Sequence, residues 1–112
     1  MSQDPTDSSQ LDGPINVADL VALQPGAVVS RTLVKKTAGT VTAFAFDAGE
    51  GLSEHTTPYD ALALNLAGEA DITISGNVHR VGPGQILRLP AHQPHAVKAT
   101  TPFKMLLIMI KT

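Results

Sequence analysis

Hydrophobic and polar residues alternate with a period of two along most of the chain after Gly26. Residues 40–46 place Thr42, Phe44 and Phe46 on one side and small or branched aliphatic residues on the other. A period of two predicts β-strands with one buried face, because successive side chains of a strand point to opposite faces. The predicted strands are residues 28–34, 40–46, 61–67, 70–75, 78–81, 85–89, 96–99 and 103–111.

Turn residues separate these strands. Gly76 and Asn77 form a two-residue hairpin signal, since both residue types adopt positive φ readily. The only helical signal is a short turn over residues 18–21 with Asn16 as its cap. Eight or nine short strands with almost no helix predict an all-β sandwich or barrel and exclude parallel α/β folds, which need crossover helices.

The two ends of the chain differ in composition. Residues 1–14 are rich in Ser, Asp, Gln and Pro and contain only Leu11 as a large residue to bury before Ile15. That composition predicts a disordered tail. Residues 15–112 have the length of one domain, so we expect a single domain there.

Composition and charge narrow the functional classes. The formal net charge is -2, and Lys35 with Lys36 is the only pair of adjacent basic residues, whereas a nucleic-acid partner would require a basic stripe. The absence of cysteine excludes disulfides, cysteine–zinc sites and thiol nucleophiles. The chain start lacks a signal-peptide pattern, and the longest apolar stretch, residues 105–110, is far shorter than the roughly 18 residues of a membrane span. We therefore expect a cytoplasmic protein with no nucleic-acid or membrane partner.

Two polar segments interrupt the strands and carry the candidate chemistry. Residues 54–60 and residues 90–95 together contain three of the four histidines. We expect the two segments to meet at the mouth of a small β-barrel, with His55 and His95 as the central pair. Imidazole nitrogen binds Zn, Fe, Mn or Ni, and it also transfers protons near neutral pH.

The same two segments resemble the two sequence motifs of the small single-domain cupins. The first motif runs here through His55, Thr57, Ala61 and Gly68. The second runs through Gly84, Pro90, His92 and His95. The resemblance covers residues 15–112 and implies a jelly-roll β-barrel, also called a double-stranded β-helix. It also implies a homodimer, which would protect the edges of the N-terminal strand.

The chain departs from the metal-binding members of that family. Their ligands are two histidines and a glutamate in the first motif and a histidine in the second. His55 and His95 keep the first and last of these positions, but Thr57 and Ala61 replace the other two. Asp60 lies one residue before the glutamate position, so it faces inward only if the strand starts late or contains a bulge. A divalent metal held by His55 and His95, with Asp60 as a weaker candidate ligand, remains one hypothesis. The other is two neutral pocket histidines that contact a ligand without a metal.

A small-molecule site is the further implication of this register. Ala61, Ala63 and Asn65 would line the pocket, with Asn65 as a polar group and Thr57 as a hydroxyl near the histidines. The predicted ligand-binding residues are therefore His55, Thr57, Asn65 and His95. His79 and His92 are expected to be exposed.

Three functions follow from these residues, and no catalytic residue is assigned. The first is a small-molecule binding or sensing module. The second is a metal-dependent cupin enzyme of the isomerase, lyase or dioxygenase type. The third is a dimeric structural module with no ligand.

Overall fold

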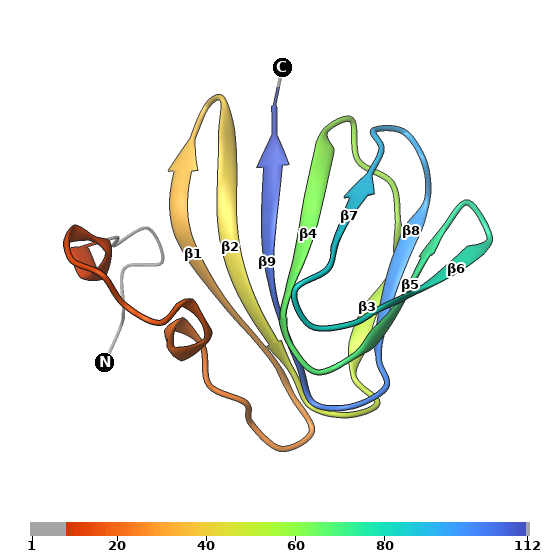
Figure 1. The fold of residues 1–112 in the computed structure, drawn as a ribbon. Coiled ribbons are helices and arrows are strands. Elements are labelled where there is room, and N and C mark those ends of the chain that lie inside the picture. Colours follow the sequence, from red (N-terminus) through yellow and green to blue (C-terminus); the bar gives the residue numbers. More distant parts are fainter. Residues whose placement is uncertain (1–8, 112) are drawn as a thin grey trace.

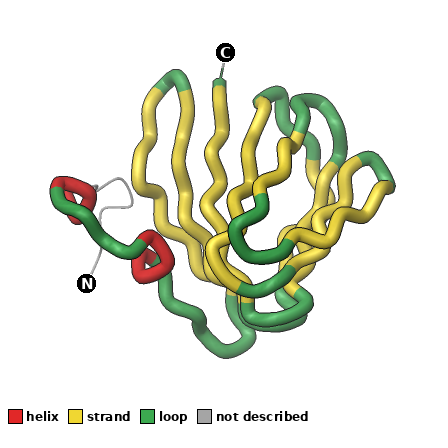
Figure 2. The backbone as a smooth tube through the Cα atoms, in the orientation of Figure 1, coloured by secondary structure: helices red, strands yellow, loops and turns green. Residues whose placement is uncertain are grey.

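The computed structural model describes residues 9–111 and has two antiparallel β-sheets facing each other (Figures 1 and 2). The strands are β1 Val28–Lys36, β2 Gly39–Phe46, β3 Gly51–His55, β4 Asp60–Ala67, β5 Ala70–Ile74, β6 Asn77–Val81, β7 Ile86–Leu89, β8 His95–Ala99 and β9 Phe103–Ile110. One sheet has the order β1-β2-β9-β4-β7, and the other has the order β3-β8-β5-β6. This arrangement confirms the predicted all-β jelly roll.

Two short 3-10 helices precede the sheets: η1 Ser9–Asp12 and η2 Val17–Leu20. The helical turn predicted over residues 18–21 is η2, and Asn16 makes no side-chain capping bond to it. Residues 1–8 of the predicted tail lie outside the described residues. No helix within residues 9–111 has the length and apolar character needed to cross a membrane.

The main core lies between the two sheets. Phe46 and Phe103 are fully buried there, with ring centroids 5.5 Å apart. Ala61, Ala63 and Asn65 alternate inward from β4 as the register predicted, and all three are buried. Small residues in β4 leave volume that the larger side chains of β9 and β2 occupy, because protein interiors pack densely.

Two details of the sequence interpretation were wrong. The hairpin between β5 and β6 turns at Ser75 and Gly76, one residue before the predicted pair, because Ile74 pairs directly with Asn77. Ser75 and Gly76 have φ values of 48° and 84°, so the positive φ that the turn needs falls on a serine. The second is that no strand was predicted for residues 51–55, which form β3 and end at His55. These residues are mostly exposed and show no alternation of buried and exposed positions.

The turn between β4 and β5 depends on Gly68. Its φ is +77°, and a Cβ atom at this position would run into the backbone carbonyl oxygen of Pro102. Only glycine combines a positive φ with this close backbone approach. The turn therefore brings the start of β9 against the end of β4.

Candidate functional site

His55 and His95 form the centre of the candidate site. His55 is the last residue of β3 and His95 the first of β8, and the two are direct partners in the antiparallel register. Their Nε2 atoms lie 3.1 Å apart, and their ring centroids are 4.3 Å apart with 68° between the planes. The fold thus brings the Nε2 atoms of two residues 40 positions apart in the sequence within hydrogen-bond distance of each other.

The Nδ1 atoms of both rings face main-chain carbonyl groups. His55 Nδ1 lies 2.8 Å from the carbonyl oxygen of Ser53, and His95 Nδ1 lies 3.3 Å from that of Gln93. A carbonyl oxygen only accepts hydrogen bonds, so each Nδ1 carries the proton and donates it. With both rings neutral, two Nε2 lone pairs would face each other, and a shared proton or another cation is needed to make the contact favourable.

The two histidines differ in exposure. His95 is 6% exposed, whereas His55 is an exposed residue at the end of its strand. Burial lowers the pKa of the His95 imidazole below its usual 6.5; the hydrogen bond to the Gln93 carbonyl opposes this, and the neighbouring His55 ring lowers the pKa further. His95 is therefore held in its neutral form near pH 7.

The structure does not bring Asp60 to the imidazoles. β4 begins at Asp60 without a bulge before Asn65, so Asp60 is exposed and faces away from the side where Ala61 is buried. Its carboxylate accepts a hydrogen bond of 2.8 Å from the Ala91 amide. Within residues 9–111, no group of three or more His, Asp or Glu side chains is arranged to hold a metal ion. The described chain therefore offers two nitrogen ligands and no carboxylate.

Thr57 holds the loop that follows His55. Its hydroxyl donates to the carbonyl of Tyr59 at 3.2 Å and accepts from the Tyr59 amide at 3.4 Å. Its own carbonyl accepts a 2.7 Å bond from the amide of His92, which has a φ of 66° and is exposed. Thr57 thus joins the two polar segments.

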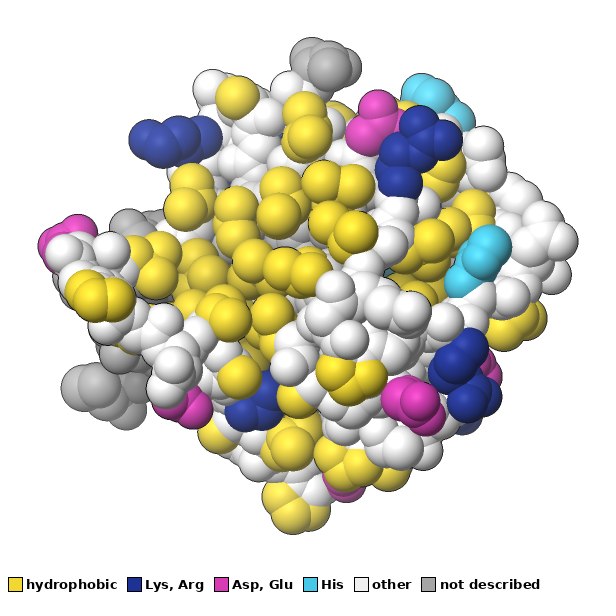
Figure 3. Space-filling model, viewed as in Figure 1, with side chains coloured by type: hydrophobic (Ala, Val, Ile, Leu, Met, Phe, Trp, Pro, Cys, Tyr) yellow, Lys and Arg dark blue, Asp and Glu magenta, His cyan; other side chains and the backbone are white. Residues whose placement is uncertain are grey.

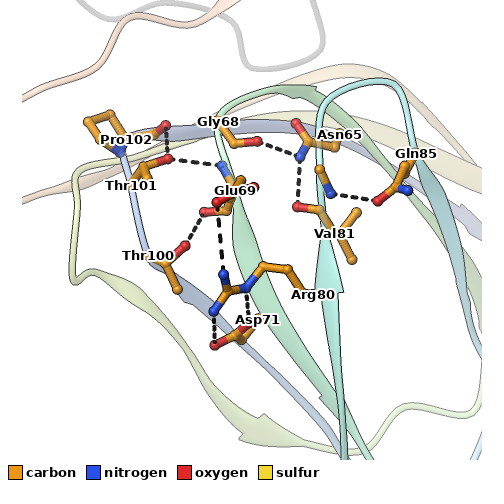
Figure 4. A network of polar contacts seen from close by, with 11 residues as sticks. Asn65, Gly68, Glu69, Asp71, Arg80, Val81, Gln85, Thr100, Thr101 and Pro102 are labelled. Carbon is orange, nitrogen blue, oxygen red and sulfur yellow. Dashed lines mark hydrogen bonds and ion pairs between the residues drawn. The ribbon is translucent and has the colours of Figure 1, made fainter.

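Asn65 is buried on the inner face of β4, with 2% of its surface exposed. Its Nδ2 donates to the carbonyl oxygens of Gly68 at 2.8 Å and Val81 at 3.1 Å (Figure 4). Its Oδ1 is buried and has no hydrogen-bond partner among residues 9–111. The side chain predicted as a ligand contact therefore already bonds the ends of two strands, and its carbonyl oxygen is the part that stays available.

A separate groove of about 430 Å³ lies along β6, the following loop and β7. It is lined by His79, Arg80, Val81, Gly84, Gln85, Ile86 and Leu87. Arg80 forms an ion pair with Asp71, and the hydrogen bond from the guanidinium lowers the pKa of the Asp71 carboxyl (Figure 4). The groove includes neither His55 nor His95 in its lining.

The sequence interpretation missed the two carbonyl groups that orient the imidazoles. Ser53 and Gln93 each lie two residues before a candidate histidine. This shared spacing is visible in the sequence, but a carbonyl has no residue-type signal.

Comparison with known proteins gives a consistent family. A family model described as a cupin domain matches residues 43–110. A solved structure of a conserved protein of unknown function from Streptococcus pyogenes is 31% identical, with a TM-score of 0.90, over 100% of this chain and 98% of that chain. A cupin superfamily protein from Desulfitobacterium hafniense is 33% identical, with a TM-score of 0.86, over 90% and 93% of the two chains.

A third solved structure comes from a longer protein. A cupin 2 conserved barrel domain protein from Leptotrichia buccalis is 42% identical, with a TM-score of 0.84, over 87% of this chain. The match covers 47% of that protein, so this chain spans about half its length. No curated protein sequence gave a match.

Proposed function

Since this chain belongs to the cupin family, we propose that it is a binding or sensing module that holds a small molecule at the barrel mouth through His55 and His95. The observation that carries the proposal is the convergence of two Nε2 atoms at 3.1 Å, with both Nδ1 atoms held by main-chain carbonyls. Two Nε2 acceptors directed at the same point favour binding of a hydrogen-bond donor or a cation, because their contact is unfavourable until such a group lies between them.

A divalent transition metal fits this pair as the shared cation. Histidines that bind metals donate their other ring N–H to a carbonyl or carboxylate, as His55 and His95 do here. Two imidazoles make a weak site alone, so oxygen atoms of the bound small molecule would complete the ligand set. A metal bound there would polarise a ligand oxygen as a Lewis acid.

The surrounding residues give this site its rigidity. The Ser53 and Gln93 carbonyls fix the ring orientations, and the amide of His92 bonds the Thr57 carbonyl to join the two loops. Preorganised side chains lose less entropy on binding.

A second candidate, an isomerase or lyase, is favoured by the lowered pKa of His95. A buried neutral imidazole with a free Nε2 lone pair can accept a proton from a bound molecule at neutral pH. Ligands found by screening would be incubated in D2O. Deuterium exchange that requires His95 would support the enzyme, and its absence would leave the binding module.

The test begins with untagged protein purified without chelators. Metal content is measured by mass spectrometry, and melting temperature is measured against divalent metals and a library of small metabolites. Ligand at about one hundred times its Kd should stabilise the fold by about 2.7 kcal/mol, a rise of roughly 10 °C.

The variants His55→Ala and His95→Ala should abolish these shifts. His79→Ala is the matched control because His79 is an exposed histidine on β6. The proposal is overturned if no metal or metabolite shifts the melting temperature of the wild-type protein. Equal shifts in the wild type and both site variants would also overturn it.

A further inference from the structure

The 90–94 loop connects β7 to β8 and leads directly into His95. Its first half is bonded to residues 57–60, through the amides of Ala91 and His92 at 2.8 Å and 2.7 Å. These two bonds do not reach the two residues immediately before His95. The position of that second half therefore depends on contacts from another part of the fold.

Ser75 holds the second half of the 90–94 loop. It lies at the tip of the β5–β6 hairpin, and its amide donates to the Pro94 carbonyl at 2.9 Å. Its hydroxyl donates to Gln93 Oε1 at 3.1 Å. Ile74, the residue before it, is the register partner of His95. The hairpin tip therefore contacts the chain at the positions that lead into the buried histidine.

The contact between the hairpin tip and the loop is polar. Ser75, Gly76, Asn77 and Gln93 are all exposed. Figure 3 shows hydrophobic side chains (yellow) gathered over β2, β9 and β4, whereas the surface at the tip of the β5–β6 hairpin is mostly white. Directional hydrogen bonds, rather than hydrophobic packing, therefore set the position of the loop against the hairpin.

Ser75 also has an unusual backbone conformation. Among residues 9–111, only Ser75 and His92 combine a positive φ with a side chain, at 48° and 66°. Asparagine, aspartate or glycine is the common residue at the first position of such a hairpin turn. Backbone strain of this kind is concentrated at functional sites, and both residues lie in the 90–94 loop or are bonded to it. The turn alone does not favour a serine, whereas the bond to Gln93 requires a side-chain donor.

The Gln93 carbonyl determines which ring nitrogen of His95 carries the proton. His95 Nδ1 lies 3.3 Å from this carbonyl, whereas His55 Nδ1 lies only 2.8 Å from the carbonyl that holds it. The longer bond thus belongs to His95. With its proton on Nε2 instead, His95 would donate to His55 Nε2 at 3.1 Å and occupy the lone pair that a cation needs. A small displacement of the Gln93 carbonyl is enough to favour that second tautomer.

We propose that Ser75 is a positioning residue that keeps the proton of His95 on Nδ1. By fixing Gln93 and Pro94, it holds the Gln93 carbonyl against the imidazole and leaves the Nε2 lone pair of His95 free for a cation or a hydrogen-bond donor. The consequence for binding rests on the proposed function of the histidine pair. The position of the proton is a property of the protein alone and is measured without a ligand.

Long-range ¹H–¹⁵N correlation spectra of the full chain at neutral pH report the protonation of each ring nitrogen, and the variant His95→Gln assigns the His95 signals. The fraction of His95 protonated on Nδ1 should be lower in Ser75→Gly and in Gln93→Ala than in the wild type. The melting temperature of Ser75→Gly should not fall, because glycine adopts this φ without strain. Ser30→Ala removes an exposed serine hydroxyl on β1, and this control should leave the His95 tautomer unchanged.

Zn²⁺ alone serves as the ligand in isothermal titrations of the same proteins. Ser75→Gly and Gln93→Ala should each raise the Zn²⁺ Kd about three- to tenfold, the effect of one net hydrogen bond. The double variant should lose no more affinity than either single variant, because both changes remove the same contact. A serine needed only for the turn would instead give no loss of affinity in Ser75→Gly.

The two measurements separate this proposal from the proposed function. Equal Nδ1 fractions in the wild type and both variants would overturn the role of Ser75. A shift in the fractions with an unchanged Zn²⁺ Kd would overturn its consequence for binding. If the fractions shift and the wild type binds no Zn²⁺, Ser75 positions His95 and the metal-binding part of the proposed function fails.

Discussion

Replacing Asn65 with alanine tests whether one buried amide holds two strand ends together. The change removes the two hydrogen bonds from Nδ2 to the Gly68 and Val81 carbonyls. Each carbonyl left without a donor costs about 1–2 kcal/mol, and the lost side-chain volume adds about 1 kcal/mol. Removing the unpaired Oδ1 returns about 1 kcal/mol. The expected loss in the free energy of unfolding is therefore about 3 kcal/mol, or roughly 12 °C in melting temperature for a domain of this size.

Thermal and urea denaturation followed by circular dichroism would measure this loss. Asn16→Ala is the matched control, because Asn16 is exposed and makes no side-chain capping bond; it should change stability by less than about 0.5 kcal/mol. Asn65→Asp keeps the volume but buries a carboxylate without donors, so it should destabilise more than alanine does at pH 7. An Asn65→Ala protein that melts within about 2 °C of the wild type would refute the reasoning.

Two further predictions follow from the buried histidine and the glycine turn. Burial lowers the pKa of His95, so below about pH 6.5 the unfolded chain binds a proton that the folded chain does not. The free energy of unfolding should therefore fall as the pH drops from about 6.5 towards the folded pKa. The slope should be at most about 1.4 kcal/mol per pH unit. Urea titrations between about pH 5 and 8 should show this slope reduced in His95→Gln and retained in His79→Gln; equal slopes would contradict the assignment. Gly68→Ala should destabilise the fold by at least about 2 kcal/mol, because alanine is strained at positive φ and its Cβ would meet the Pro102 carbonyl. Gly13→Ala is the control: a Cβ atom there would meet nothing within 4 Å, so the change should be neutral. Melting temperatures would separate the two, and similar values would argue against the constraint at Gly68.

The relatives with solved structures agree with the fold and leave the ligand open. The protein from Streptococcus pyogenes, which this chain matches over 98% of that protein's length, is a conserved protein of unknown function. Identification of a ligand for this chain therefore depends on the paired imidazoles and the screen proposed for them.

The alternation of hydrophobic and polar residues determined the strands and an all-β sandwich or barrel, because a period of two is a local property that each segment carries by itself. The jelly roll was predicted from the resemblance of the two motifs to the cupins. Residues 61–67 showed that one side of β4 would be small and the other leucine-rich, and the motif register predicted that Ala61, Ala63 and Asn65 face inward, where they are buried. The sequence also indicated that residues 54–60 and 90–95 meet, but only through the resemblance of their motifs.

Tertiary structure decided what the local pattern could not. The Nε2 contact between His55 and His95, their Nδ1 bonds to main-chain carbonyls and the outward position of Asp60 depend on the register between strands distant in sequence. The leucines of β4 read equally well as core residues until the sheet placed them on its outer face, beside Ile108 and Ile86. Side-chain direction along one strand is a local property, whereas what covers that side chain depends on which strands and segments pack beside it.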